Sequence, residues 1–83
     1  MANVSAKFCN NYGESRLWVI WDMKRDPNVP PVIFNGYLDP NQCTDSLSLY
    51  AGDDLWGQAV YQRSDGAQQV VDTITDGSTV NME

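Results

Sequence analysis

The side chains of this 83-residue chain that could do acid–base chemistry are carboxylates rather than imidazoles. The sequence holds eleven acidic and five basic residues and no histidine. The absence of histidine excludes a histidine-containing catalytic triad, an imidazole general base and a histidine metal site. A pair of carboxylates could still act across a cleft, as in glycoside hydrolysis, but it needs a separation of about 5–10 Å. Asp53 and Asp54 are adjacent in the sequence and would point apart on an extended backbone.

Other motifs of catalysis or cofactor binding are absent from the sequence. It contains no Gly-x-Ser-x-Gly elbow, phosphate loop or dinucleotide fingerprint. A single domain of this size also has little room for a catalytic cleft. We therefore expect a protein that is not an enzyme, with no catalytic residue and no cofactor.

Aspartates make up nine of the eleven acids. Aspartate oxygens are good calcium ligands, but none of these residues fits a contiguous calcium-loop pattern. Aspartate also favours turns, and this role explains each of them without a metal. We expect no metal site among the aspartates of the predicted turns, which are Asp39, Asp45, Asp53, Asp54, Asp65 and Asp76.

The two cysteines, Cys9 and Cys43, have thirty-three residues between them. Two thiols alone cannot make a four-ligand zinc site, and there is no Cys-x-x-Cys motif. In an oxidising compartment a bridge between them would stabilise the fold by roughly 3–4 kcal/mol on the chain-entropy estimate. The alternative is two unpaired, small apolar residues in a cytosolic protein. We favour a Cys9–Cys43 disulfide, because so small a domain gains much from one covalent link.

The stretch 17–22, Leu-Trp-Val-Ile-Trp-Asp, is apolar on both faces of an extended strand. We expect Leu17, Val19 and Trp21 to point into the core and Trp18 to point away from it. Similar alternation in the other strands assigns seven residues to the core: Leu17, Val19, Trp21, Phe34, Leu38, Leu47 and Leu49. It leaves an outward aromatic set, which consists of Trp18, Ile33, Tyr37, Tyr50 and Tyr61. The alternative is ordinary packing, in which a second layer or a folded loop covers these side chains.

An outward aromatic surface with polar edges suits recognition. Tryptophan and tyrosine are enriched at protein interfaces, and flat aromatic rings also pack against sugar rings. We expect a non-enzymatic binding module that uses the outward aromatic set, with a protein partner or self-association favoured and a carbohydrate-binding, lectin-like module as the alternative. A small acidic inhibitor or immunity-type protein is a further alternative, based on the net charge of −6. A structural or assembly subunit fits the same features.

The overall composition limits the environment and the partners. An acidic domain repels nucleic-acid backbones, and no run of eighteen apolar residues predicts a membrane span. The first residues carry no signal segment, so the protein is either cytosolic or has lost its signal. Because we favour a disulfide, we expect an extracytoplasmic or secreted protein, with a cytoplasmic location as the alternative.

Turn-forming residues divide the chain into seven predicted strands, at 4–9, 17–22, 32–38, 45–50, 55–63, 69–75 and 78–82. The turn-rich segment 10–15 predicts a hairpin between the first two strands, and Asp65-Gly66 predicts another. Three prolines within 23–31 predict a surface connection. We expect the whole chain, 1–83, to form one small antiparallel β-sandwich, with a small β-barrel as the alternative.

The order of these features resembles the general arrangement of small secreted β-sandwich proteins. The resemblance is carried by Trp21, by Gly36-Tyr37-Leu38 and by Trp56-Gly57. Thaumatin-like and aegerolysin-like domains are similar in how they begin. This chain lacks the many cysteines of the first family and is shorter than either, so no functional residue is carried over.

Overall fold

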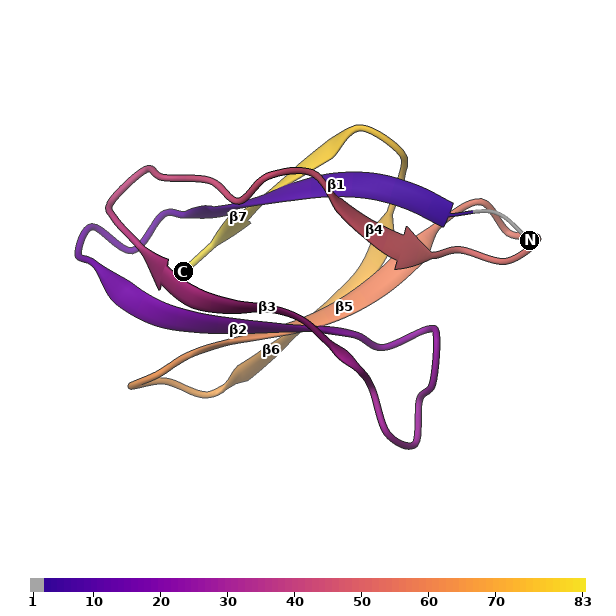
Figure 1. Cartoon of the computed structure of the whole chain (residues 1–83), viewed down its shortest axis with the longest axis horizontal. Helices are drawn as coiled ribbons and strands as arrows, with labels where there is room; N and C mark the ends of the chain where they lie inside the picture. The colour runs from indigo at the N-terminus through magenta and orange to yellow at the C-terminus, as the bar shows by residue number, and fades with distance from the viewer. Residues whose placement is uncertain (1–2) are drawn as a thin grey trace.

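Seven β-strands make up the regular structure of residues 3–83, the part of the chain that the computed structural model describes (Figure 1). They are β1 (Asn3–Asn10), β2 (Arg16–Asp22), β3 (Val32–Leu38), β4 (Leu47–Tyr50), β5 (Gly57–Arg63), β6 (Gln68–Ile74) and β7 (Ser78–Met82). Every predicted strand is present; the bounds of β3 and β7 are as predicted, and those of the other strands differ by one or two residues at one or both ends. Within residues 3–83 no helix could cross a membrane.

The strands form two separate sheets that face each other. One sheet has the order β4-β1-β7 and the other the order β3-β2-β5-β6. Figure 1 shows the three-stranded sheet above the four-stranded one. The predicted β-sandwich is confirmed, and the closed barrel given as its alternative is not what forms. Strand pairs are antiparallel except for β1 and β7, which run parallel to each other.

The predicted hairpin between the first two strands is wrong, because β1 and β2 lie in different sheets. Segment 11–15 crosses from one sheet to the other instead of joining neighbours. Both strands take central positions, β1 between β4 and β7 and β2 between β3 and β5. A strand that is apolar on both faces favours such a central position. The hairpin predicted at Asp65-Gly66 is confirmed, since β5 and β6 pair antiparallel.

The predicted orientation of β2 is also wrong. Trp18, Ile20 and Asp22 are completely buried between the sheets, whereas Leu17 and Trp21 lie half-buried on the outside. Alternation separates the two faces of a strand but does not say which face is inside when both are apolar. Here the side that ends in a charged residue is the inner one.

The carboxylate of Asp22 can be buried because donors surround it. It accepts hydrogen bonds from the backbone N–H of Tyr50 at 2.9 Å, from the backbone N–H of Arg25 at 3.3 Å and from Arg25 Nε at 3.2 Å. A buried carboxylate is tolerated only when such partners replace water. Since Tyr50 belongs to β4, this single side chain also joins the two sheets.

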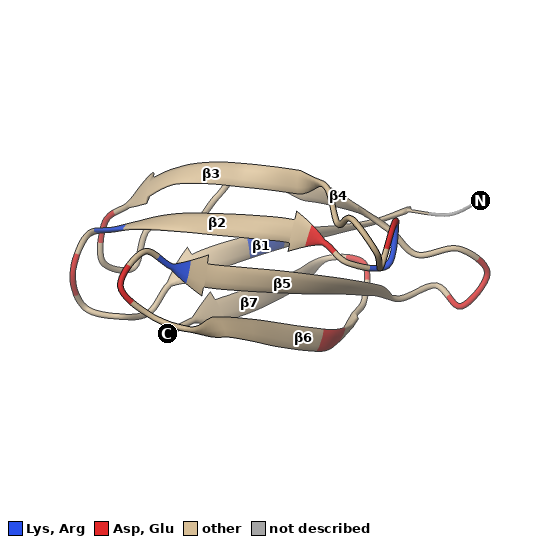
Figure 2. Cartoon of the chain, turned by 90° about the horizontal axis from the view of Figure 1, so that it is seen from below, with Lys and Arg blue, Asp and Glu red and all other residues tan. Residues whose placement is uncertain are grey.

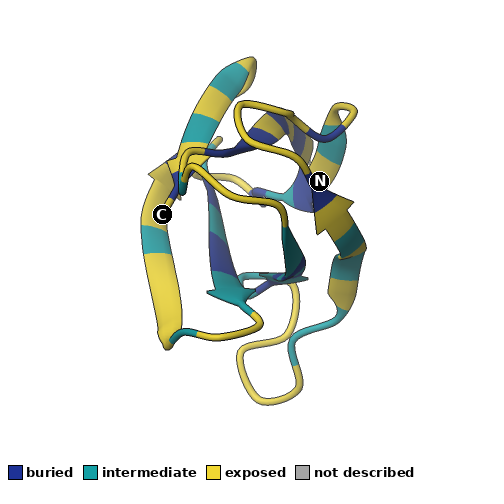
Figure 3. Ribbon diagram, turned by 90° about the vertical axis from the view of Figure 1, so that its left-hand side faces the viewer, coloured by how far each residue is buried: buried dark blue, intermediate teal, exposed yellow. Residues whose placement is uncertain are grey.

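The core side of the three-stranded sheet is formed by every second residue of its strands. Val4, Ala6 and Phe8 of β1 are buried, as is Leu49 of β4. Figure 3 shows the buried positions gathered between the sheets and the exposed ones in the outer strands and loops. Ala51 and Ala59 are fully buried as well, so small side chains share the interior with the large indole of Trp18.

The predicted disulfide is present between Cys9 and Cys43. It lies where the segment before β4 runs antiparallel to the end of β1. The N–H of Thr44 donates to the carbonyl of Phe8 at 2.8 Å, and the N–H of Asn10 donates to the carbonyl of Gln42 at 2.9 Å. The bridge therefore holds a connection that has no strand of its own against a central strand.

Replacing both cysteines by serine should lower the free energy of unfolding by about 3–4 kcal/mol, because the open chain regains the entropy of the loop between them. Denaturant unfolding of the double variant and of the intact protein measures this difference. The reduced wild-type protein is the matched control and should behave like the double variant. Equal stability of the oxidised and reduced forms would contradict the structural role given to the bridge.

The indole N–H of Trp18 is buried and has no hydrogen-bond partner. Trp18→Phe removes this unsatisfied donor and leaves a small cavity, so the two effects should nearly cancel and change stability by less than about 1 kcal/mol. Trp18→Leu keeps no aromatic ring and should lose roughly 2–4 kcal/mol. Thermal or denaturant unfolding measures the stability of both variants. A loss of stability well above 1 kcal/mol in Trp18→Phe would show that the indole N–H makes a hydrogen bond in the folded protein.

Candidate functional site

The outer surface of the four-stranded sheet carries a continuous set of uncharged side chains. We call this set the neutral face. Its members point outward along all four strands: Leu17, Val19 and Trp21 of β2, Val32, Asn35 and Tyr37 of β3, Val60 and Gln62 of β5, and Gln68 and Val70 of β6. Seven of these ten are apolar or aromatic and three are amides. Val60 is covered by its neighbours and is only 8% exposed.

Strand register brings these side chains together. Trp21 lies opposite Val32 on one neighbouring strand and opposite Val60 on the other. Val60 lies in turn opposite Val70 of β6. Directly opposite residues in a sheet point to the same face, so these four form an apolar row across all four strands.

Charged residues are kept to the ends of this sheet. Figure 2 looks onto it and shows that the charged positions within its strands lie at their ends, blue at one end of β2 and β5 and red at the other end of β2 and β6, while the loops carry both colours. Arg16 and Arg63 start and end their strands and point to the inner side. Asp22 is buried, and Asp72 stands near the end of β6. The centre of the face is therefore free of charge, although the chain carries a net charge of −6.

A hollow of about 250 Å³ opens beside Trp21 on the neutral face. Trp21, Met23, Pro30, Val60 and Gln68 line it. Its walls combine an indole, three apolar side chains and one amide, and none of them is charged. Such a surface can bind an apolar side chain or the C–H face of a neutral sugar ring, and it offers no group for acid–base chemistry.

The predicted outward aromatic set does not form one patch. Trp18 is sealed in the core, and the Tyr61 ring packs against it with the ring centroids 5.9 Å apart. Ile33 packs against the core, and Tyr50 lies on the other sheet with Arg25 over its ring. Only Tyr37 is on the neutral face, where it is 72% exposed. The expectation of a surface built from these five residues is therefore wrong for Trp18, Ile33, Tyr50 and Tyr61.

The exposed face instead contains Leu17, Val19 and Trp21, which the sequence placed in the core. The relevant sequence signal is the absence of charge at the outward positions of β2, β3 and β5 and at Gln68 and Val70 of β6, with Asp72 as the charged exception near the strand end. That signal becomes readable only when the register shows which positions are neighbours.

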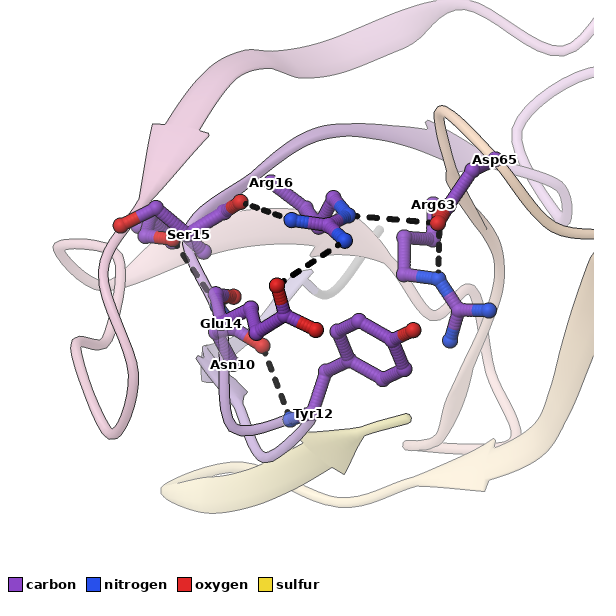
Figure 4. A network of polar contacts seen from close by, with 8 residues as sticks. Asn10, Tyr12, Glu14, Ser15, Arg16, Arg63 and Asp65 are labelled. Carbon is purple, nitrogen blue, oxygen red and sulfur yellow. Dashed lines mark hydrogen bonds and ion pairs between the residues drawn. The ribbon is translucent and has the colours of Figure 1, made fainter.

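A separate polar cluster joins the segment after β1 to the β5–β6 turn (Figure 4). The Tyr12 ring lies between two guanidinium groups, with Arg63 Cζ 3.8 Å and Arg16 Cζ 5.2 Å from its centroid. Both arginines also bind the carboxylate of Asp65. These contacts balance the local charges, which favours a structural role in holding the turn.

The same cluster shifts two pKa values. The hydrogen bond from Arg63, reinforced by that from Arg16, lowers the pKa of the Asp65 carboxyl below its ordinary value. The hydrogen bond to Asp65 and the nearby Glu14 raise the pKa of Arg16. Both shifts favour the charged forms, as expected for oppositely charged neighbours.

Several other aspartates bind groups on segments far from them in the sequence. Asp76 Oδ1 accepts from the N–H of Ser5, and Asp39 Oδ1 accepts from the hydroxyl of Ser15. Asp54 pairs with Lys24, whose ammonium lies 3.7 Å from the centroid of the Trp56 ring. Among residues 3–83 no group of three or more cysteines and acids is placed to hold a metal ion.

Comparison with protein families, with curated proteins and with solved structures finds no match to this chain. The resemblance to small secreted β-sandwich proteins therefore supplies no functional argument beyond the fold. The function has to be inferred from the chain's own surface.

The pKa of Asp65 provides a direct test of the polar cluster. Because this pKa is lowered in the folded state, the contribution of the carboxylate to stability is present above its unfolded pKa and is lost as the pH falls through its folded pKa. Arg63→Gln should raise the pKa of Asp65 more than Arg16→Gln, since the Arg63 hydrogen bond is the larger cause. Carboxyl-carbon NMR titration measures both, and a larger rise in the Arg16 variant would contradict the assignment.

Proposed function

We propose that this protein is a non-enzymatic interaction module that contacts another protein surface through the neutral face, and that the first such surface is a second copy of the chain. The observation that carries the proposal is the uncharged centre of this face around Trp21 and Val60. Protein interfaces are depleted of charge at their centres and enriched in aromatic residues. Val32, Tyr37 and Val70 are exposed by 54%, 72% and 53%, and exposed apolar side chains gathered on one face of a small domain commonly mark an interaction site.

The charge distribution favours self-association through this face. Two chains that each carry a charge of −6 repel each other, and the repulsion is strongest where acidic loops approach. Contact through the neutral face keeps the acidic loops at the ends of the sheet away from the centre of the contact. Tyr37 and Val32, exposed by 72% and 54%, would lose the most water on contact.

A neutral carbohydrate is the second candidate ligand, and the hollow beside Trp21 is the observation that favours it. The indole offers a flat apolar surface, and the amide of Gln68 can both donate to and accept from hydroxyl groups. An inhibitor of a basic enzyme remains a third proposal, supported only by the net charge. The disulfide supports an oxidising, extracytoplasmic location for any of these roles.

Sedimentation analysis over a range of concentrations tests the first proposal. The wild-type protein should associate reversibly, and Trp21→Thr should weaken the association by about 30-fold, as expected for a central interface tryptophan. Trp56→Thr is the matched control, because it also removes a half-buried indole but from the loop before β5. A wild-type protein that stays monomeric, or two variants with equal effects, would contradict the proposal.

Titration with a panel of neutral oligosaccharides separates the second candidate from the first. Binding that shifts tryptophan fluorescence and disappears in Trp21→Thr, without association of the protein, would favour the carbohydrate. Self-association that no oligosaccharide in the panel changes would favour the protein contact.

A further inference from the structure

The edge of the four-stranded sheet at β6 has no partner within residues 3–83. The strand runs from Gln68 to Ile74 and pairs only with β5. Its residues from Gln68 to Val70 are exposed, Val70 by 53%. A long edge strand presents unpaired N–H and C=O groups that can accept another strand, unless charge, proline, a bulge or shortness prevents this.

The other edges of the sandwich are shorter or carry such protection. Strand β4 has four residues, and the N–H of its Tyr50 is taken by the carboxylate of Asp22. Strand β3 follows two consecutive prolines, Pro30 and Pro31, and its pairing with β2 is interrupted by a bulge. Strand β7 has five residues. Of these edges, β6 is the least protected one with seven residues.

Only the second half of β6 carries features that hinder pairing with another strand. A bulge opposite Gln58 places Asp72 and Thr73 between the pairs Gly57–Ile74 and Ala59–Val71. The first half, 68–71, has the sequence Gln-Gln-Val-Val, with no charge, proline or glycine. Its pairing with β5 is regular over these four residues. This half can therefore continue the sheet.

We infer that segment 68–72 of β6 pairs antiparallel with the same segment of a second copy, about a two-fold axis at Val70. Side chains that lie opposite each other must share a face, and Val70 and Gln68 both point to the neutral face. An axis at Val70 satisfies this condition. It places Val70 opposite Val70, Gln69 opposite Val71 and Gln68 opposite Asp72.

This register is compatible with the charges on the strand. The two Asp72 carboxylates are offset by four residues, or roughly 14 Å at 3.4 Å per residue. That distance exceeds the Debye length of about 8 Å at physiological ionic strength. Each Asp72 instead faces the amide of Gln68 from the other copy, which can donate a hydrogen bond to it. Asp65, in the nearby turn, is already paired with Arg16 and Arg63.

The pairing joins two four-stranded sheets into one and places two neutral faces side by side. It uses the backbone edge of β6 rather than the centre of the neutral face, and the two surfaces adjoin at Val70. If both contacts form, each copy has two self-complementary interfaces, and the assembly is larger than a dimer: a closed tetramer when the two axes intersect at right angles, an open chain when they do not intersect.

Two lysine substitutions test the edge pairing. Val70→Lys places two like charges directly opposite each other at the axis and should weaken edge association by about tenfold or more. Val32→Lys is the matched control, since Val32 is equally exposed at 54%, lies on the same outer face and belongs to the opposite edge strand, β3. Sedimentation velocity compares both variants with the wild type, and the control should associate more strongly than Val70→Lys.

Amide hydrogen exchange gives a readout that does not depend on a variant. Amides of 68–72 should become more protected as the protein concentration rises, while those of β3 should not change through this contact. Three results would overturn the edge pairing. The wild-type protein could be monomeric at every concentration, the two lysine variants could weaken association equally, or the exchange rates of the β6 amides could be independent of protein concentration. Trp21→Thr separates the two interfaces, because it should weaken the face contact and leave edge dimers intact. If Trp21→Thr abolishes all association and Val70→Lys has no effect on it, the protein associates only through the neutral face and the edge pairing is wrong.

Discussion

The inward orientation of Trp18, Ile20 and Asp22 fixes the direction of the side chains across the four-stranded sheet. Side chains alternate along a strand, and opposite residues on paired strands share a face. Once these three are inside, the register of β2 with β3 and β5 sends Leu17, Val19 and Trp21 outward together with their neighbours. The neutral face is therefore a consequence of what the core holds. The buried carboxylate of Asp22 contributes to this orientation, because its donors include a backbone group of the opposite sheet.

Two local links hold β4 and the segment before it in place. Asp22 connects the end of β2 to Tyr50 of β4, and the Cys9–Cys43 bridge fixes the segment before β4 against β1. In a domain of 83 residues the apolar core is small, and such links supply stability that a larger core would supply by burial alone. The cluster around Tyr12 has a similar role at the β5–β6 turn, where cations, a ring and a carboxylate meet.

The surface divides into regions of different chemistry. Carboxylates gather in the turns, where several bind groups on other segments of the chain, and the middle of the four-stranded sheet has no charge. This separation is the basis of the interaction that we propose. The face and the β6 edge adjoin at Val70, which belongs to both. These neighbouring surfaces are the two that we propose for assembly with copies of the chain.

The sequence by itself determined the seven strands and the β5–β6 hairpin, because turn residues and alternation act over a few neighbouring positions. It favoured a β-sandwich over a barrel and a Cys9–Cys43 disulfide over two free thiols, and the structure contains both. Its alternation also located the buried side of β1 correctly, where Val4, Ala6 and Phe8 alternate with polar residues. For β2 both sides are apolar, and local pattern carries no information on which is inside. Only the tertiary structure decided this, because the choice depends on donors from Tyr50 and Arg25 around Asp22 and on packing between strands far apart in the chain. The same holds for the parallel pairing of β1 with β7 and for the neutral face, which exist only once the register has brought distant strands together.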